Sequence, residues 1–204
     1  MKHSIKNYIL LLSILGLMSC GGSKDNGYVP KPKGYNRIDM PEPSYQTLQE
    51  KHPYHFEYSK HAHIRPDSSG IAEPHWIHII YPKFIADIQL TYKGVANSPN
   101  KSSEDLLAEF IDDAHKLKSK ILIKADKERE SLYQTPKGKT AAIFELGGEV
   151  PTQLQFYVTD STQHFLRGAL YFKTASKNDS LAPVIEFMKK DVMHLLNTLE
   201  WRDY

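Results

Sequence analysis

The chain has 204 residues, of which 26 are Lys or Arg, 24 are Asp or Glu, and one, Cys20, is a cysteine. A single cysteine excludes an internal disulfide, and the near balance of charge without a basic cluster argues against a nucleic-acid-binding protein. The length is sufficient for one domain with a sizeable core.

The first nineteen residues have the order of a signal peptide. Lys2 and Lys6 form a basic start, and an almost wholly apolar run of eleven residues follows from Tyr8 to Met18. This run is far shorter than the ~20 residues that span a bilayer, but it suits the hydrophobic region of a signal peptide. We therefore predict that residues 1–19 are a lipoprotein signal peptide.

The residues around the cysteine predict lipidation. Leu17, Ser19 and Cys20, followed by two glycines, resemble a bacterial lipobox, in which a peptidase cuts before the cysteine and its thiol is acylated. The alternative is a buried free thiol in a hydrophobic helix. With two or more acyl chains, such as palmitate, Cys20 would hold the protein stably at a membrane. Residues 1–19 contain two lysines and no acids, so the cleaved chain keeps 24 basic and 24 acidic residues and has no net charge.

Residues 20–45 are predicted to be the lipidated cysteine, a flexible tether and an extended strip. The segment 21–36 is rich in Gly, Lys and Pro and has few aliphatic side chains, so it cannot bury much surface. Prolines at positions 30, 32, 41 and 43 favour extended backbone. The strip either packs along the domain surface or docks a partner.

Residues 46–204 are predicted to form a single domain. Strands are expected at 55–58, at 75–81 and at 87–92, where apolar and polar residues alternate. A helix follows, with Ser102 as its cap and acidic residues in its first turn. One apolar stripe on this helix is expected to be buried, formed by Leu106, Leu107, Phe110, Ile111, Ala114, Leu117 and Ile121.

The second half of the domain repeats this scheme. Strands are expected at 141–146 and 154–159, and turn residues at 160–163 lead into a hairpin partner at 164–173. Asp179 or Ser180 is the expected cap of the last helix. Its predicted apolar stripe contains Leu181, Val184, Ile185, Met188, Val192, Leu195 and Leu199. This order predicts an α+β fold with a mostly antiparallel sheet packed with helices. It also resembles the Mog1/PsbP-like α/β/α sandwich, an analogy at the level of the fold.

Candidate reactive groups are few. His61 and His63 would share one face of a strand, whereas His75 and His78 would lie on opposite faces, and neither pair has a recognised metal-ligand spacing. A triad of Asp160, His164 and an intervening Ser161 or Thr162 is conceivable, but these are common turn residues. We predict no enzyme, no cofactor and no metal site, and Cys20 is the only site residue. A metal-dependent hydrolase is the weakest alternative.

The aromatic content is more suggestive of binding. The chain contains twelve tyrosines, eight phenylalanines and two tryptophans. Tyr157 is expected on the polar side of its strand, beside Gln153 and Gln155. Exposed tyrosines favour protein–protein contacts, although ordinary core packing also accounts for most aromatic residues.

Two segments resemble the gliding motility lipoprotein GldD family of the Bacteroidetes. One is YVPKPKGY (28–35), which continues into Arg37-Ile38 and PEPSY (41–45), and the other is QFYVTDSTQHFLRGALYF (155–172) with the closing Leu199-Glu200-Trp201. Shorter matches lie between them at 56–59, 81–83 and 90–92. The resemblance runs from Cys20 to Trp201.

This resemblance implies a lipid-anchored envelope protein required for gliding motility and the linked type IX secretion machinery. It implies a non-enzymatic accessory or assembly factor whose partners are other proteins of that machinery and the membrane. Because Gly21-Gly22-Ser23 come directly after the cysteine and only Lys24-Asp25 follow them, we expect the protein to face the periplasm. The alternative is a periplasmic binder of a small envelope ligand, a glycan or a peptide, which requires a deep pocket with convergent polar groups.

Overall fold

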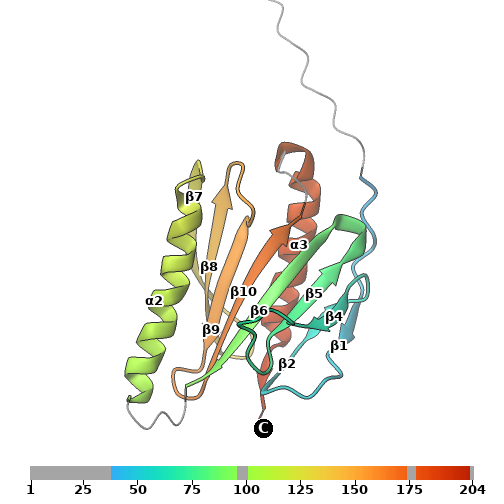
Figure 1. The fold of residues 1–204 in the computed structure, drawn as a ribbon. Helices are drawn as coiled ribbons and strands as arrows, with labels where there is room; N and C mark the ends of the chain where they lie inside the picture. The colour runs from blue at the N-terminus through green and yellow to red at the C-terminus, as the bar shows by residue number, and fades with distance from the viewer. Residues whose placement is uncertain (1–37, 96–100, 174–177, 203–204) are drawn as a thin grey trace, which may run out of the picture. The chain divides into compact units, whose positions relative to one another are not determined.

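The computed structural model describes residues 38–95, 101–173 and 178–202 (Figure 1). The chain divides into two units after Tyr35, and all described residues belong to the second unit, Asn36–Tyr204. The predicted signal peptide, Cys20 and most of the predicted tether lie outside the described residues.

In the second unit, one run of strands precedes helix α2 and another run precedes helix α3. Its first half contains β1 (Tyr45–Thr47), β2 (Tyr54–His55), β3 (Glu57–Ser59), β4 (His63–Pro66), β5 (Ile77–Tyr81), the short 3₁₀ helix η2 (Pro82–Phe84) and β6 (Ala86–Gly94). Its second half contains α2 (Ser103–Leu122), β7 (Lys127–Gln134), β8 (Thr140–Gly147), β9 (Leu154–Thr159), β10 (His164–Phe172), α3 (Asn178–Thr198) and β11 (Glu200–Trp201).

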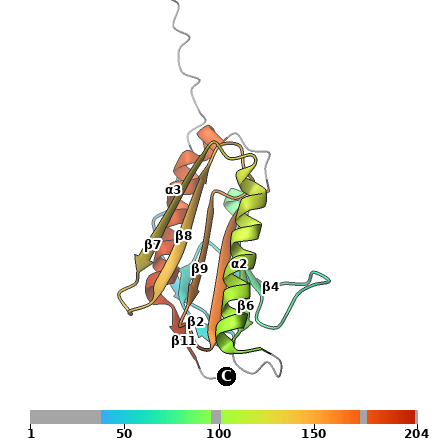
Figure 2. The same cartoon turned by 90° about the vertical axis from the view of Figure 1, so that its left-hand side faces the viewer.

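Seven strands form one sheet in the order β4-β5-β6-β10-β9-β8-β7, and every neighbouring pair is antiparallel. Two small antiparallel pairs, β1 with β3 and β2 with β11, lie outside it. Figure 2 shows the large sheet between α2 and α3. This arrangement confirms the predicted α+β class with a mostly antiparallel sheet. The alternating strand at 87–92 lies within β6, and the predicted hairpin is β9–β10.

Helix α3 covers one face of the sheet and completes the main core. Its predicted stripe is confirmed, because Val184, Met188, Val192, Leu195 and Leu199 are buried. The predicted cap is wrong: the helix begins at Asn178, so both candidates lie inside its first turn.

Helix α2 covers the other face less completely than its sequence predicted. Ser102 is its cap, and the Ser102 side chain accepts a hydrogen bond from the Asp105 backbone N–H, as expected. Of the predicted stripe, however, only Ala114 is fully buried, and Leu117 is 42% exposed. The cause is the position of α2, which lies over the half of the sheet that contains β7 and β8. Lys118 is buried there, with its Nζ 2.7 Å from Glu128 Oε1 of β7 and 4.5 Å from the centre of the Phe144 ring.

Other differences from the sequence prediction lie at strand ends and edges. The strand expected at 55–58 is divided between β2 and β3, and the strand expected at 75–81 begins only at Ile77. His75 precedes it in the left-handed region, with φ of 69°. Strand β7, whose first four residues are charged, was not predicted. It forms one edge of the sheet, where charged side chains discourage pairing with another chain.

A glycine and an aromatic ring fit together at the centre of the sheet. Gly168 of β10 is directly opposite Phe156 of β9, and a Cβ built at Gly168 would lie 2.2 Å from Phe156 Cζ. The ring therefore occupies the space that a side chain at Gly168 would need.

Gly168→Ala is expected to reduce the free energy of unfolding by about 1–3 kcal/mol, because overpacking forces the ring out of its place. Gly94→Ala in β6 is a matched control, since the nearest heavy atom would lie 3.9 Å from its Cβ. Urea denaturation of both variants measures the difference. Equal stability of the two variants would show that the close approach of Phe156 does not matter.

A buried carboxyl group joins α3 to β5. Asp191 is 3% exposed, and its Oδ2 accepts a hydrogen bond of 3.0 Å from Tyr81 Oη. Burial raises the pKa of Asp191 above its ordinary value, and the hydroxyl donors of Tyr81, Ser59 and Tyr45 offset only part of this effect. The folded state therefore holds the Asp191 proton more tightly than the unfolded state.

The stability contributed by protonated Asp191 is present below the ordinary carboxyl pKa and is lost as the pH rises through the raised pKa. Asp191→Asn does not ionise, so its stability relative to the natural protein should increase from about pH 3 to about pH 7. Denaturation of both proteins at each pH measures this difference. A difference that is constant or falls with pH would contradict the assignment.

Candidate functional site: a groove beside helix α2

The predicted site residue, Cys20, lies outside the described residues, and its lipidation stays a prediction. In the part of the chain that the structure describes, neither helix combines the length and the apolar character needed to cross a membrane.

The end of the predicted strip packs along the domain. Ile38 and Met40 contact the main core, and Lys83 Nζ donates a hydrogen bond of 2.8 Å to the Asp39 carbonyl. The Tyr45 ring stacks on His194 of α3, with 3.5 Å between ring centres. Of the two alternatives for the strip, surface packing therefore holds for its described part.

The conceivable triad is a turn. Asp160 Oδ1 accepts hydrogen bonds from the backbone N–H groups of Thr162, Gln163 and His164, at 2.9–3.0 Å. Burial alone would raise the pKa of Asp160, but these three donors hold it below its ordinary value. His164 Nδ1 lies 2.8 Å from Tyr92 Oη. His164 Nε2 lies 3.9 Å from Asp160 Oδ2.

Asp160→Ala is expected to reduce the free energy of unfolding by about 1–3 kcal/mol, because three backbone donors lose their acceptor. Asp160→Asn keeps an acceptor oxygen at this position and should lose clearly less. Thermal or urea unfolding compares them. Equal losses would show that the turn does not depend on the oxygen.

The described histidines that the sequence paired lie apart from one another. His61 precedes β4, which begins at His63, so the two do not share a strand face as predicted. His75 precedes β5, so it is not on a strand with His78 either. His78 instead lies between two acids, with Nδ1 2.9 Å from Asp87 Oδ2 and Nε2 3.7 Å from Asp67 Oδ2. Within the described ranges, no group of three or more His, Cys, Asp or Glu side chains is placed to hold a metal ion.

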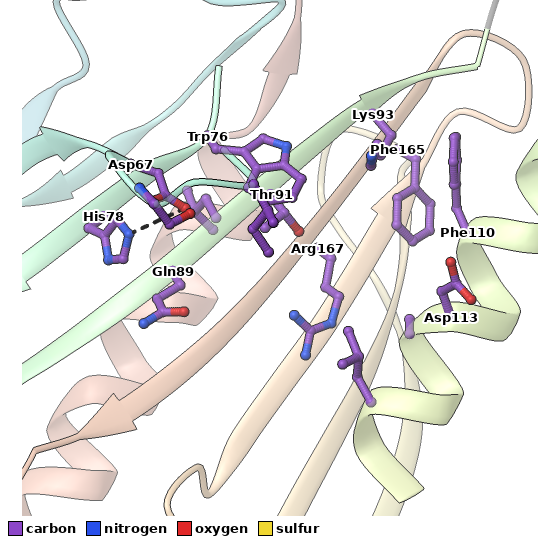
Figure 3. Close-up of a pocket in the computed structure, with 15 residues that line it drawn as sticks. Asp67, Trp76, His78, Gln89, Thr91, Lys93, Phe110, Asp113, Phe165 and Arg167 are labelled. Carbon is purple, nitrogen blue, oxygen red and sulfur yellow. Dashed lines mark hydrogen bonds and ion pairs between the residues drawn. The ribbon is translucent and has the colours of Figure 1, made fainter. Parts of the chain in front are cut away.

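A groove of about 560 Å³ lies between α2 and the part of the sheet that α2 leaves uncovered (Figure 3). The floor consists of β6 and β10, which contribute Gln89, Thr91 and Arg167. Helix α2 contributes Phe110 and Leu117 as one wall. The segment from Asp67 to Trp76, which connects β4 to β5, contributes the opposite wall.

Aromatic rings form one end of the groove. Phe110 of α2 and Phe165 of β10 lie with their ring centres 5.7 Å apart. Trp76 is fixed by a hydrogen bond of 2.8 Å from its Nε1 to the Tyr92 carbonyl. Lys93 Nζ lies between these rings, 5.3 Å from the centre of Trp76 and 5.8 Å from that of Phe110, and it pairs with Glu73.

Arg167 lies at the centre of the groove floor, between the sheet residues and α2 (Figure 3). Its Nη2 donates a hydrogen bond of 2.7 Å to Gln155 Oε1. Burial lowers the pKa of the guanidinium below its ordinary value, and the Tyr171 hydroxyl offsets part of this effect. The groove therefore combines apolar walls with polar groups directed at one place, the arrangement of a binding site.

The comparison with protein families agrees with this chain over most of its length. The model of the family described as gliding motility lipoprotein GldD matches residues 25–201. The chain belongs to this family. Membership identifies it as a lipoprotein associated with gliding motility, which implies an envelope protein anchored to a membrane.

Other comparisons add little about the GldD family. No curated protein matches the chain. Among solved structures, the chain is similar to the solution structure of cyanobacterial PsbP (CyanoP) from Synechocystis, with 10% sequence identity and a TM-score of 0.44. The match covers 81% of this chain and 97% of the cyanobacterial chain.

Sequence reasoning missed the groove, although part of the signal was present. The polar side of the strand at 87–92 was recognised, and Gln89 and Thr91 line the groove from that side. Arg167 of β10 lies on the same face of the sheet as Gln89 and Thr91, directly opposite Thr91 of β6. Tyr157, expected to be exposed on this face, is half-buried against Phe165 beneath α2.

Proposed function

We propose that this chain is a lipid-anchored, non-enzymatic accessory or assembly factor of gliding motility and of the linked type IX secretion machinery. The observation that carries the proposal is the match of the GldD family to residues 25–201. The lipobox-like sequence at Cys20 supplies the anchor, since stable anchoring needs no transmembrane helix.

The orientation and the partners are part of the same proposal. Gly21-Gly22-Ser23 after the cysteine, without an early acidic cluster, favour a protein that faces the periplasm. Its partners are other proteins of the motility and secretion machinery. A non-enzymatic role is supported by Asp160, because three backbone N–H groups of its turn already bind one oxygen of its carboxylate.

A second candidate is the binding of a small envelope ligand, a glycan or a peptide. The groove beside α2 favours it, because its volume of about 560 Å³ is in the range of ligand pockets and its lining combines apolar and polar side chains.

Replacement of Cys20 tests the first proposal. Cys20→Ala should prevent labelling with an alkyne analogue of palmitate, release the protein from the membrane fraction and abolish colony spreading. Ser23→Ala, three residues further on, is the control and should retain all three properties. A Cys20→Ala protein that stays in the membrane fraction and supports full spreading would contradict the proposal.

Crosslinking in intact envelopes tests the partners. The protein with Cys20 should recover motility or secretion subunits, and Cys20→Ala should recover fewer. Recovery of no protein partner by either form would favour the second candidate.

A further inference from the structure

The charged side chains around the groove differ in whether they have partners. Lys93 pairs with Glu73, and Asp113 Oδ1 lies 3.4 Å from Lys116 Nζ. Asp67 lies 3.7 Å from His78. Arg167 is the exception, because among the described residues no carboxylate oxygen lies within 4.0 Å of its guanidinium.

The environment of Arg167 is prepared for an acceptor. Gln155 Oε1 accepts from one Arg167 nitrogen, and this bond fixes which end of the Gln155 amide faces the guanidinium, because arginine has donors only. Gln155 is 2% exposed, and its Nε2 donor has no hydrogen-bond partner in the described part of the chain. A guanidinium carries five N–H donors in a fork that matches a carboxylate. Gln155 and the Tyr171 hydroxyl use part of this fork, and the remaining donors are left for a ligand.

Apolar surface continues directly from this charge. Leu117 of α2 is 42% exposed and lines the groove together with Phe110, Phe165 and Arg167. An occupant with a carboxylate at Arg167 would therefore place its neighbouring group against an aliphatic and aromatic wall. On the other side, Gln89 and Thr91 offer hydrogen-bonding groups.

We propose that the groove binds an acidic peptide segment of a partner protein, with a carboxylate on Arg167 and an adjacent apolar side chain between Phe110 and Leu117. The proposal rests on the proposed function as a partner-binding accessory factor and names the surface that it uses. A peptide fits better than a fatty acid, because Gln89 and Thr91 would hydrogen-bond backbone amides that an acyl chain lacks. It also fits better than an acidic sugar, which has no side chain to bury on the apolar wall.

The direct test is peptide binding to the full-length lipidated protein in detergent. The probes are fluorescein-labelled octapeptides of glycine and serine that contain adjacent leucine and aspartate, in both orders, and matched peptides with asparagine in place of aspartate. The aspartate peptide should bind at least about tenfold more tightly than its asparagine counterpart, the difference expected for one charge-assisted contact. Equal binding of the two peptides, or no binding of either, would overturn the proposal.

Variants of the protein test whether the preference for the aspartate peptide arises in the groove. Arg167→Gln should abolish the preference for aspartate, whereas Arg129→Gln on the edge strand β7 should leave it unchanged. Leu117→Glu serves as a second variant if Arg167→Gln loses stability, because the new carboxylate on the exposed side of α2 repels the peptide. Asp113→Asn, which removes a native carboxylate from the groove, should strengthen binding. An aspartate preference that survives both Arg167→Gln and Leu117→Glu would overturn the proposal.

Competition experiments distinguish the three classes of ligand that could supply the carboxylate: a peptide, a fatty acid and an acidic sugar. Hexanoate and galacturonate should displace the aspartate peptide at least about tenfold less well than the unlabelled peptide. Binding of either compound that depends on Arg167, in the absence of any peptide binding, would replace the proposed peptide with that ligand class.

In cells, Arg167→Gln and Cys20→Ala distinguish this inference from the proposed function. Both should reduce spreading, but only Cys20→Ala should leave the membrane fraction. If Cys20→Ala abolishes spreading and Arg167→Gln does not, the groove proposal fails and the proposed function stands. If cells that carry Cys20→Ala spread normally, the proposed function fails, regardless of the result of the peptide-binding experiment.

Discussion

The antiparallel pairing of β6 with β10 is the interaction on which the rest of the structure depends. It runs in continuous register from His164 opposite Gly94 to Phe172 opposite Ala86, and it joins the two halves of the chain at the centre of the large sheet. On one face of this pair, Leu90 and Leu166 enter the core beneath α3. On the other face, the same register sets Thr91 beside Arg167 and so creates the floor of the groove. Core and candidate site thus result from one pairing, with side chains alternating between two faces.

The groove exists because a single helix, α2, covers this face of a sheet of seven strands. Helix α2 connects β6 to β7, the far edge strand, and Lys118 holds it there through Glu128 and Glu130. The helix therefore leaves the β4–β6 side of this face open, and the segment before β5 forms the facing wall. Three segments distant in sequence meet around a guanidinium that is partly desolvated and held by an amide. The Arg167 guanidinium has already lost part of its hydration, so a charge-assisted hydrogen bond to a carboxylate would stabilise it. This makes it a suitable centre for the recognition of an acidic ligand.

The sequence predicted those features that periodicity controls. The stripe of α3, the Ser102 cap, the alternation in β6 and the β9–β10 hairpin all follow from local spacing and turn chemistry. The sequence did not predict β7, since its charged residues are exposed or pair with Lys118 of α2. It also overestimated the burial of Leu117, because the seating of α2 is decided by Lys118 and its partners. The groove could not be derived, as it requires the register that brings Arg167 to Thr91 and a helix placed off centre.

The central claim is that the groove beside α2 is the surface through which this lipid-anchored protein meets its partner. Photo-crosslinking in living cells tests it most directly, with benzoylphenylalanine in place of Leu117 in the groove and, separately, of Leu132, which is 75% exposed on β7. The probe at Leu117 should capture a motility or secretion protein, Arg167→Gln should abolish this capture, and the probe at Leu132 should not capture it. Capture of the same protein from both positions, or capture at Leu117 that persists with Arg167→Gln, would contradict the claim.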